Sequence, residues 1–158
     1  MNYRRYYEQQ RNAGAQYETF VAEQLRRFWG KEVKEHRTMQ DQLRYGDLRV
    51  DGVDVEVKFD DQFAKTTRLY IEIDERTQRG VARLIPSGIY ATSSAKFYLI
   101  GDGREAYLFD RQELREWQRR NRPPIVTTEY RSGHGFLLHP VDRNHLKQDY
   151  FQWMNVGL

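Results

Sequence analysis

The chain contains no cysteine and no long apolar run. Without cysteine it can form neither disulfide bonds nor thiolate metal sites, which suits a reducing compartment. No stretch approaches the roughly 20 apolar residues of a membrane-spanning helix, and the segment MNYRRYYEQQ lacks the apolar core of a signal peptide. We therefore expect a soluble, cytoplasmic protein that has no membrane partner.

The composition is that of an ordinary globular domain, with 39% hydrophobic and 31% charged residues. A length of 158 residues is enough to bury one hydrophobic core, so residues 1–158 are expected to form a single domain. The net charge is +3 and the isoelectric point is about 9.1. This balance favours an anionic partner without requiring one.

Apolar periodicity predicts a helix followed by a mainly antiparallel sheet interrupted by helices, which defines an α/β or α+β fold. The first helix is expected over about residues 6–29, ending at Gly30, with an apolar stripe made of Tyr17, Phe20, Val21, Leu25 and Phe28. The polar residues 31–43 are expected to form a poor strand and a loop. Strands are expected at 48–50, 53–59, 69–73, 96–100, 106–109, 125–129 and 136–138, with helices at about 110–120 and from about 142.

The segment RYGDLRVDGVDVEVKFD, residues 44–60, carries the strongest local signal. Its Asp51-Gly52 pair between two alternating runs predicts a two-residue hairpin turn. That turn fixes the register, so that Val50 faces Val53, Arg49 faces Asp54, Leu48 faces Val55 and Asp47 faces Glu56. Alternation then places the apolar residues on one face of the hairpin, and on the other Asp47, Arg49, Asp54, Glu56 and Lys58.

Two carboxylates placed opposite each other, Asp47 and Glu56, destabilise a sheet and raise the pKa of one of them. A divalent cation reverses that cost, because Mg²⁺ binds one or two carboxylates and completes its shell with water and phosphate oxygens. Lys58, on the same face, could orient or help deprotonate an attacking water and offset charge on a phosphate oxygen. The hairpin therefore predicts half of a metal-dependent phosphodiesterase site.

Gly46-Asp47, eight intervening residues and then Glu56-Val57-Lys58 resemble the active-site motif of the PD-(D/E)xK nucleases, the restriction-endonuclease-like superfamily. Gly46 stands where that motif usually has proline. Many members, including small resolvase-like nucleases, also bring a glutamate from the first helix, a few residues after a glycine. Glu18, four residues after a glycine and on the inward stripe of the predicted helix, matches this third feature.

The resemblance covers about residues 13–73. It implies a restriction-endonuclease-like core, with a mixed central sheet flanked by helices and a first helix that carries a glutamate. It also implies Mg²⁺ as cofactor, with Mn²⁺ able to substitute. The implied metal ligands are Glu18, Asp47, Glu56 and the backbone carbonyl of Val57, and Lys58 joins the three acids as a catalytic residue.

Further candidates lie outside this motif. Glu72 alternates with apolar residues in LYIEIDE, so it is expected either to join the acids on the next strand or to be a solvated carboxylate. The histidines share no metal-ligand spacing. Candidate DNA contacts, each with a plain surface or loop role as the alternative, are Arg4, Arg5, Arg49, Ser87, Lys96 and His134. Residues 1–12 form a basic and aromatic arm that continues into the first helix.

Two functions follow from these features. The first is a Mg²⁺-dependent DNA endonuclease of bacterial or phage-like type, structure-selective like a Holliday-junction resolvase, or a restriction or repair enzyme. A homodimer is expected, joined through the first helix or the final stretch DYFQWMNVGL. The alternative is a non-catalytic nucleic-acid-binding or interaction module in which Arg49 pairs with Asp54 and Lys58 neutralises Glu56. A glycosidase using Asp47 and Glu56 is disfavoured, because no deep sugar cleft is implied.

Overall fold

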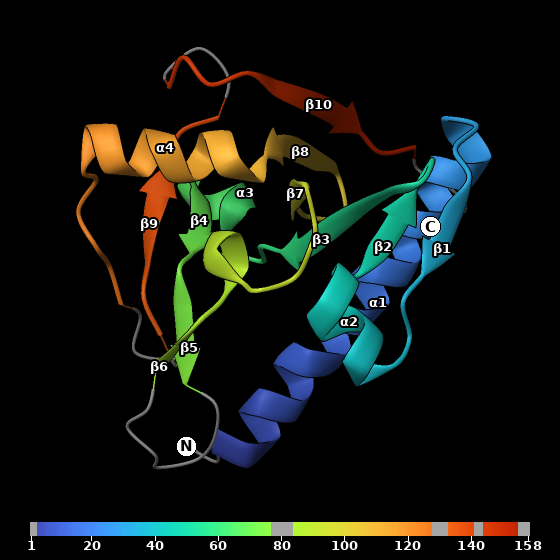
Figure 1. Cartoon of the computed structure of the whole chain (residues 1–158), viewed down its shortest axis with the longest axis horizontal. Coiled ribbons are helices and arrows are strands. Elements are labelled where there is room, and N and C mark those ends of the chain that lie inside the picture. Colours follow the sequence, from blue (N-terminus) through green and yellow to red (C-terminus); the bar gives the residue numbers. More distant parts are fainter. Residues whose placement is uncertain (1–2, 77–83, 128–132, 141–143, 155–158) are drawn as a thin grey trace.

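The computed structural model describes residues 3–76, 84–127, 133–140 and 144–154, with the backbone alone for 3–11 and 76. It is a mixed α+β structure with a central sheet flanked by helices (Figure 1). The elements are α1 (Tyr3–Phe28), β1 (Val33–Glu35), α2 (Met39–Tyr45), β2 (Leu48–Val50), β3 (Val53–Phe59), α3 (Phe63–Thr66), β4 (Leu69–Glu72), β5 (Asp74–Arg76), β6 (Leu84–Pro86), η1 (Gly88–Tyr90), β7 (Phe97–Gly101), β8 (Glu105–Asp110), α4 (Arg111–Asn121), β9 (Gly135–Leu138) and β10 (Gln148–Gln152). In the described part of the chain, no helix is long and apolar enough to cross a bilayer.

The central sheet has six strands in the order β1-β2-β3-β7-β8-β10. Only β3 and β7 pair in parallel; the other neighbouring strands are antiparallel. The β2–β3 hairpin has the predicted register for Val50–Val53, Arg49–Asp54 and Leu48–Val55. Both turn residues have positive φ, 48° at Asp51 and 82° at Gly52, as a type I′ turn requires. Outside this sheet, β4 pairs with β9 and β5 with β6.

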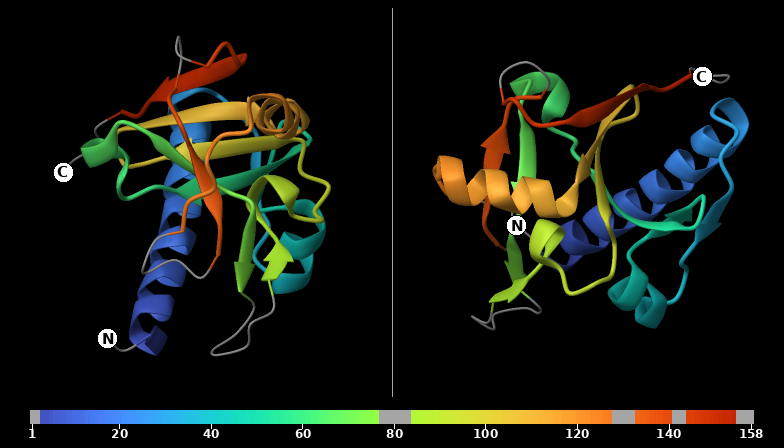
Figure 2. Two further views of the ribbon diagram at one scale, coloured as in Figure 1. Left: turned by 90° about the vertical axis from the view of Figure 1, so that its left-hand side faces the viewer. Right: turned by 45° about the horizontal axis from the view of Figure 1, so that its top comes forward.

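Each face of the sheet has its own hydrophobic core. On one face α1 packs Tyr17, Val21 and Leu25 against a set that includes Val55 and Val57. The other face of the sheet is covered by α4, β4 and β9 (Figure 2). There Leu114 of α4 packs with the sheet residues Tyr98, Ile100 and Phe109. Tyr98 and Ile100 lie beside Glu56 and Lys58 in the parallel β3–β7 register. Glu56 and Lys58 therefore point toward the α4 side of the sheet, opposite to α1.

Two sequence predictions in the amino-terminal half are wrong. Residues 39–43, expected as part of a loop, belong to α2 (residues 39–45), whose start is capped by the Thr38 hydroxyl accepting the Asp41 N–H at 3.1 Å. The helix has no buried residue, so hydrophobic periodicity carried no signal for it. Phe28, assigned to the apolar stripe of α1, is instead 38% exposed because it lies at the last turn, beyond the sheet contact.

The carboxyl-terminal prediction is also corrected. Residues 148–152, expected to belong to a short helix from about residue 142, form strand β10 on the edge of the central sheet. Trp153 is buried in the α1 core, whereas Tyr150 and Met154 of the same final stretch are exposed, so its role in a dimer contact stays a prediction. Of the strand expected at 125–129, Val126 makes an isolated bridge to Gly135; residues 128–132 and 141–143 lie outside the described residues.

Candidate active site

The end of α2 determines the position of Asp47. Gly46 closes that helix with φ 90°, and its N–H donates to the Gln42 carbonyl at 2.9 Å. A proline has neither this N–H nor this φ, which explains why glycine occupies the position. The Asp47 N–H then donates to the Val55 carbonyl at 3.0 Å, so the predicted fourth pair with Glu56 is not part of the ladder.

Three carboxyl groups act on one another electrostatically at this break in the ladder. Asp47 Oδ2 accepts the backbone N–H of Val57 at 2.8 Å, which holds its side chain against β3. Asp47 interacts with Glu18 from α1 and with Glu56 from β3, and each acid influences the pKa of its neighbour. The assignment of Glu18, Asp47 and Glu56 as metal ligands stays a prediction.

The pKa values of these three acids are all raised, because burial and neighbouring negative charge outweigh the attraction of nearby cations. Burial, with the charge of Glu18 adding to it, raises the pKa of Asp47 to about 6. Burial and the charge of Asp47 raise the pKa of Glu56 to about 7. Burial also raises the pKa of Glu18. Near neutral pH the cluster therefore retains protons that separate carboxyls would have lost.

Lys58 lies beside the cluster, and its ammonium forms an ion pair with Glu72 at 3.3 Å. Attraction to Glu72 raises the pKa of Lys58 well above its ordinary value, outweighing burial. Lys58 therefore remains a cation, which suits it to orient a water or to stabilise negative charge.

Glu72 reaches the site by a different route from the one expected. It belongs to β4, which pairs with β9 rather than with the central sheet. Glu75, which sequence reasoning missed, also lies near: burial, then the charge of Glu72, raise its pKa, and Glu56 adds to the effect. Simple alternation from Glu72 places Glu75 on the opposite face. The strand breaks at Ile73, between β4 and β5, and this break resets the alternation.

Gly88 controls the backbone that carries Glu72, and this contact gives a first prediction. It has φ 57°, and a Cβ added there would lie 2.1 Å from the Glu72 carbonyl oxygen. Gly88→Ala is expected to lower the free energy of unfolding by roughly 2–4 kcal/mol, from overpacking plus left-handed strain. Urea unfolding measures this, with Gly14→Ala as control, since nothing lies within 4 Å of that position. Equal stability of the two variants would contradict this close packing.

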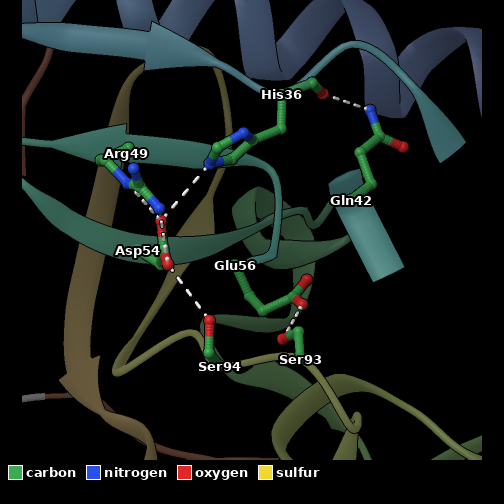
Figure 3. Close-up of polar contacts among 7 residues, drawn as sticks. All are labelled: His36, Gln42, Arg49, Asp54, Glu56, Ser93 and Ser94. Carbon is green, nitrogen blue, oxygen red and sulfur yellow. Dashed lines mark hydrogen bonds and ion pairs between the residues drawn. The ribbon is translucent and has the colours of Figure 1, made fainter. Parts of the chain in front are cut away.

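A second polar cluster, built on Asp54, differs in charge balance (Figure 3). Asp54 accepts from Arg49 Nε at 2.9 Å and from Ser94 at 3.1 Å, and lies 3.3 Å from His36 Nε2. Burial acts to raise the pKa of Asp54, but the hydrogen bonds from Arg49, His36 and Ser94 together lower it. Asp54 is therefore an ionised, satisfied carboxylate, unlike Glu56 two residues later.

The expected DNA contacts are scattered. Arg49 is engaged with Asp54, and its guanidinium lies over the Tyr45 ring. Lys96 is exposed, with its ammonium 5.3 Å from the centre of the Phe97 ring. Both cations remain near the surface beside the hairpin.

The remaining candidate DNA contacts are Ser87, His134, Arg4 and Arg5. Ser87 is only 6% exposed, so its hydroxyl does not face solvent. His134 Nδ1 lies 2.8 Å from Asp74 Oδ1, which orients the ring. Arg4 and Arg5 belong to α1, and their side chains lie outside the described residues.

The carboxyl groups of Asp47 and Glu56 are oxygen donors of the kind that a hard cation prefers. Within the described ranges, no group of three or more His, Asp or Glu side chains converges as a metal-ligand set. Mg²⁺ does not need one, since it keeps several waters and uses one or two carboxylates. Asp47 and Glu56, whose negative charges oppose each other, supply that pair of oxygen donors.

No protein-family model matches the chain, and no match was found among curated proteins or solved structures.

Proposed function

We propose that this protein is a Mg²⁺-dependent DNA endonuclease that hydrolyses phosphodiester bonds. The observation that carries the proposal is the excess of carboxyl groups around Lys58, of which Glu56 is buried and the others are half-buried. Glu18, Asp47, Glu56 and Glu72 all act on its ammonium, which is ion-paired to Glu72. An array of this kind is costly unless a cation joins it, because like charges and burial both oppose ionisation.

Asp47 and Glu56 would hold the metal, with Glu18 adjoining through Asp47 and the Val57 carbonyl as a further donor implied by the resemblance. When bound, Mg²⁺ supplies Lewis-acid polarisation of a phosphate oxygen and a more acidic water. Lys58 keeps a positive charge beside this position, where charge grows on the phosphate as the bond breaks. Its side chain is 36% exposed, so a substrate could reach it.

The alternative, a non-catalytic nucleic-acid-binding module, has one observation in its favour. The cross-strand pair that it requires, Arg49 with Asp54, is formed. Its other requirement was that Lys58 neutralise Glu56, whereas the ion pair of Lys58 is with Glu72. The raised pKa of Glu56 is consistent with incomplete neutralisation and favours the nuclease.

Structure-selective cleavage of branched DNA by a homodimer remains our proposal for substrate and assembly. Cutting two strands in one event requires two sites at a fixed spacing. The dimer contact would be made by α1 or by the final stretch, in which Tyr150 and Met154 are exposed.

Cleavage assays test the proposal directly. Supercoiled, linear, single-stranded and four-way-junction DNA would each be offered with Mg²⁺, Mn²⁺ or EDTA. We expect cleavage with either metal, none in EDTA, and a loss of roughly 100-fold in Lys58→Ala, because a charge-stabilising group is removed. Lys65→Ala, which removes an exposed lysine of α3, is the matched control and should cleave normally.

Two results would count against the nuclease. Failure to cleave any DNA form with either metal would favour the binding module. Undiminished cleavage by Lys58→Ala would mean that the activity resides elsewhere or in a contaminant.

A further inference from the structure

Two neighbouring serines between η1 and β7 bind different carboxylates of the same strand (Figure 3). Ser93 Oγ donates to Glu56 Oε1 at 2.7 Å. Ser94 Oγ donates to Asp54 Oδ2 at 3.1 Å. The segment is also fixed to α2 by its backbone, since the Ser94 N–H donates to the Arg44 carbonyl at 2.8 Å.

Ser93 is itself held by Arg111, the first residue of α4. Arg111 Nη1 donates to Ser93 Oγ at 3.1 Å, and Nη2 donates to the Ser93 carbonyl at 2.6 Å. Because the guanidinium can only donate, it occupies an acceptor site on the hydroxyl and leaves the hydroxyl proton for Glu56. The result is a directed chain from Arg111 through Ser93 to Glu56.

The chain is buried along its whole length. Arg111 and Ser93 are each 6% exposed, and Glu56 is 8% exposed. Burying a guanidinium is costly unless its donors are satisfied, and satisfied buried networks restrict side chains to one arrangement. Arg111 directs two of its N–H donors to Ser93, the residue that contacts Glu56. This arrangement indicates that the network fixes the Glu56 carboxyl.

We propose that Ser93 and Arg111 are positioning residues for Glu56. Ser93 holds the Glu56 carboxyl facing Asp47, and Arg111 holds Ser93. The role of this arrangement in metal binding rests on the proposed function, whereas its effect on the Glu56 conformer does not. Sequence reasoning missed both residues, because Ser93 lies 37 positions and Arg111 55 positions after Glu56, and no local pattern connects them.

Metal binding gives a readout other than catalysis. Titration calorimetry with Mg²⁺ and Mn²⁺ would compare the parent with Ser93→Ala, Ser93→Thr, Ser94→Ala and Arg111→Met. Loss of an outer hydrogen bond to a metal ligand typically weakens binding by about 10- to 100-fold. We expect a loss of that size in Ser93→Ala and Arg111→Met. Ser93→Thr should restore most of the affinity, because it keeps the hydroxyl.

Ser94→Ala is the matched control, since it removes the adjacent hydroxyl from Asp54 and leaves Glu56 untouched. It should bind metal like the parent. Parent-like affinity in a folded Ser93→Ala, or equal losses in both serine variants, would overturn the proposal. Thermal unfolding of each variant separates weakened binding from loss of the fold.

Crystal structures of the metal-free parent and the two alanine variants distinguish this proposal from the proposed function. The Glu56 carboxyl should turn away from Asp47 in Ser93→Ala and stay in place in Ser94→Ala. If the parent binds no metal but Glu56 still turns in Ser93→Ala, the nuclease assignment fails and the positioning role stands. If Glu56 does not move in Ser93→Ala, the positioning role is wrong whatever the metal result.

Discussion

Asp47→Asn is expected to abolish metal-dependent cleavage and at the same time to stabilise the metal-free protein at about pH 8. The amide keeps the size of the carboxylate and can still accept the Val57 N–H. It removes an anionic ligand, which should lower cleavage by about 1,000-fold or more. It also removes a buried charge beside Glu18 and Glu56, which should raise the free energy of unfolding by about 2 kcal/mol.

Urea unfolding in EDTA and cleavage in Mg²⁺ would be measured on the same preparations. Asp54→Asn, in the neighbouring strand β3, is the matched control. The pKa of Asp54 is lowered rather than raised, so this substitution should destabilise the protein. If the free energy of unfolding rises in Asp47→Asn and falls in Asp54→Asn, the charge of Asp47 destabilises the fold and the charge of Asp54 stabilises it. A less stable Asp47→Asn, or one that still cleaves, would remove the basis of the metal site.

The β2–β3 hairpin could be predicted from sequence because its determinants are local. A turn pair with positive φ at Asp51 and Gly52 fixes the register, and alternation then fixes the faces. The phase of α1 likewise placed Glu18 inward. The departure at Asp47 could not be predicted, because it depends on how α2 ends at Gly46 and redirects the chain into β2.

Long-range neighbours account for the rest of what the sequence did not predict. Alternation correctly placed Glu72 on the opposite face of its strand from the flanking apolar residues. It could not identify the strand with which this segment pairs. The structure brings β4 to the site as part of a second sheet with β9, and so gives Lys58 its partner. In the same way β10, with polar and apolar residues in no helical pattern, is a strand because β8 offers it an edge. Tertiary packing decides such elements.

The metal-free protein should lose stability as pH rises from about 4.5 to about 7.5, and Mg²⁺ should restore it only at the upper end. In the folded chain the pKa of Asp47 is about 6 and that of Glu56 about 7, against ordinary values of 3.8 and 4.5. Within this window the folded chain binds more protons than the unfolded chain. Stability from these groups is therefore full below their ordinary pKa values and is lost as pH rises through the raised ones.

Thermal unfolding at about pH 5 and about pH 8, in EDTA and in millimolar Mg²⁺, measures this linkage. A coupled loss of about 3 kcal/mol between these pH values corresponds to a fall in Tm of roughly 6–12 °C for a chain of this size. The double variant Asp47→Asn/Glu56→Gln is the reference, because it keeps every other titrating group, and its Tm should change less with pH and not respond to Mg²⁺. Since protons and Mg²⁺ compete for the same oxygens, the metal should have little effect on the parent at the lower pH. Equal stabilisation by Mg²⁺ at both pH values, or in the double variant, would place the cation somewhere other than between Asp47 and Glu56.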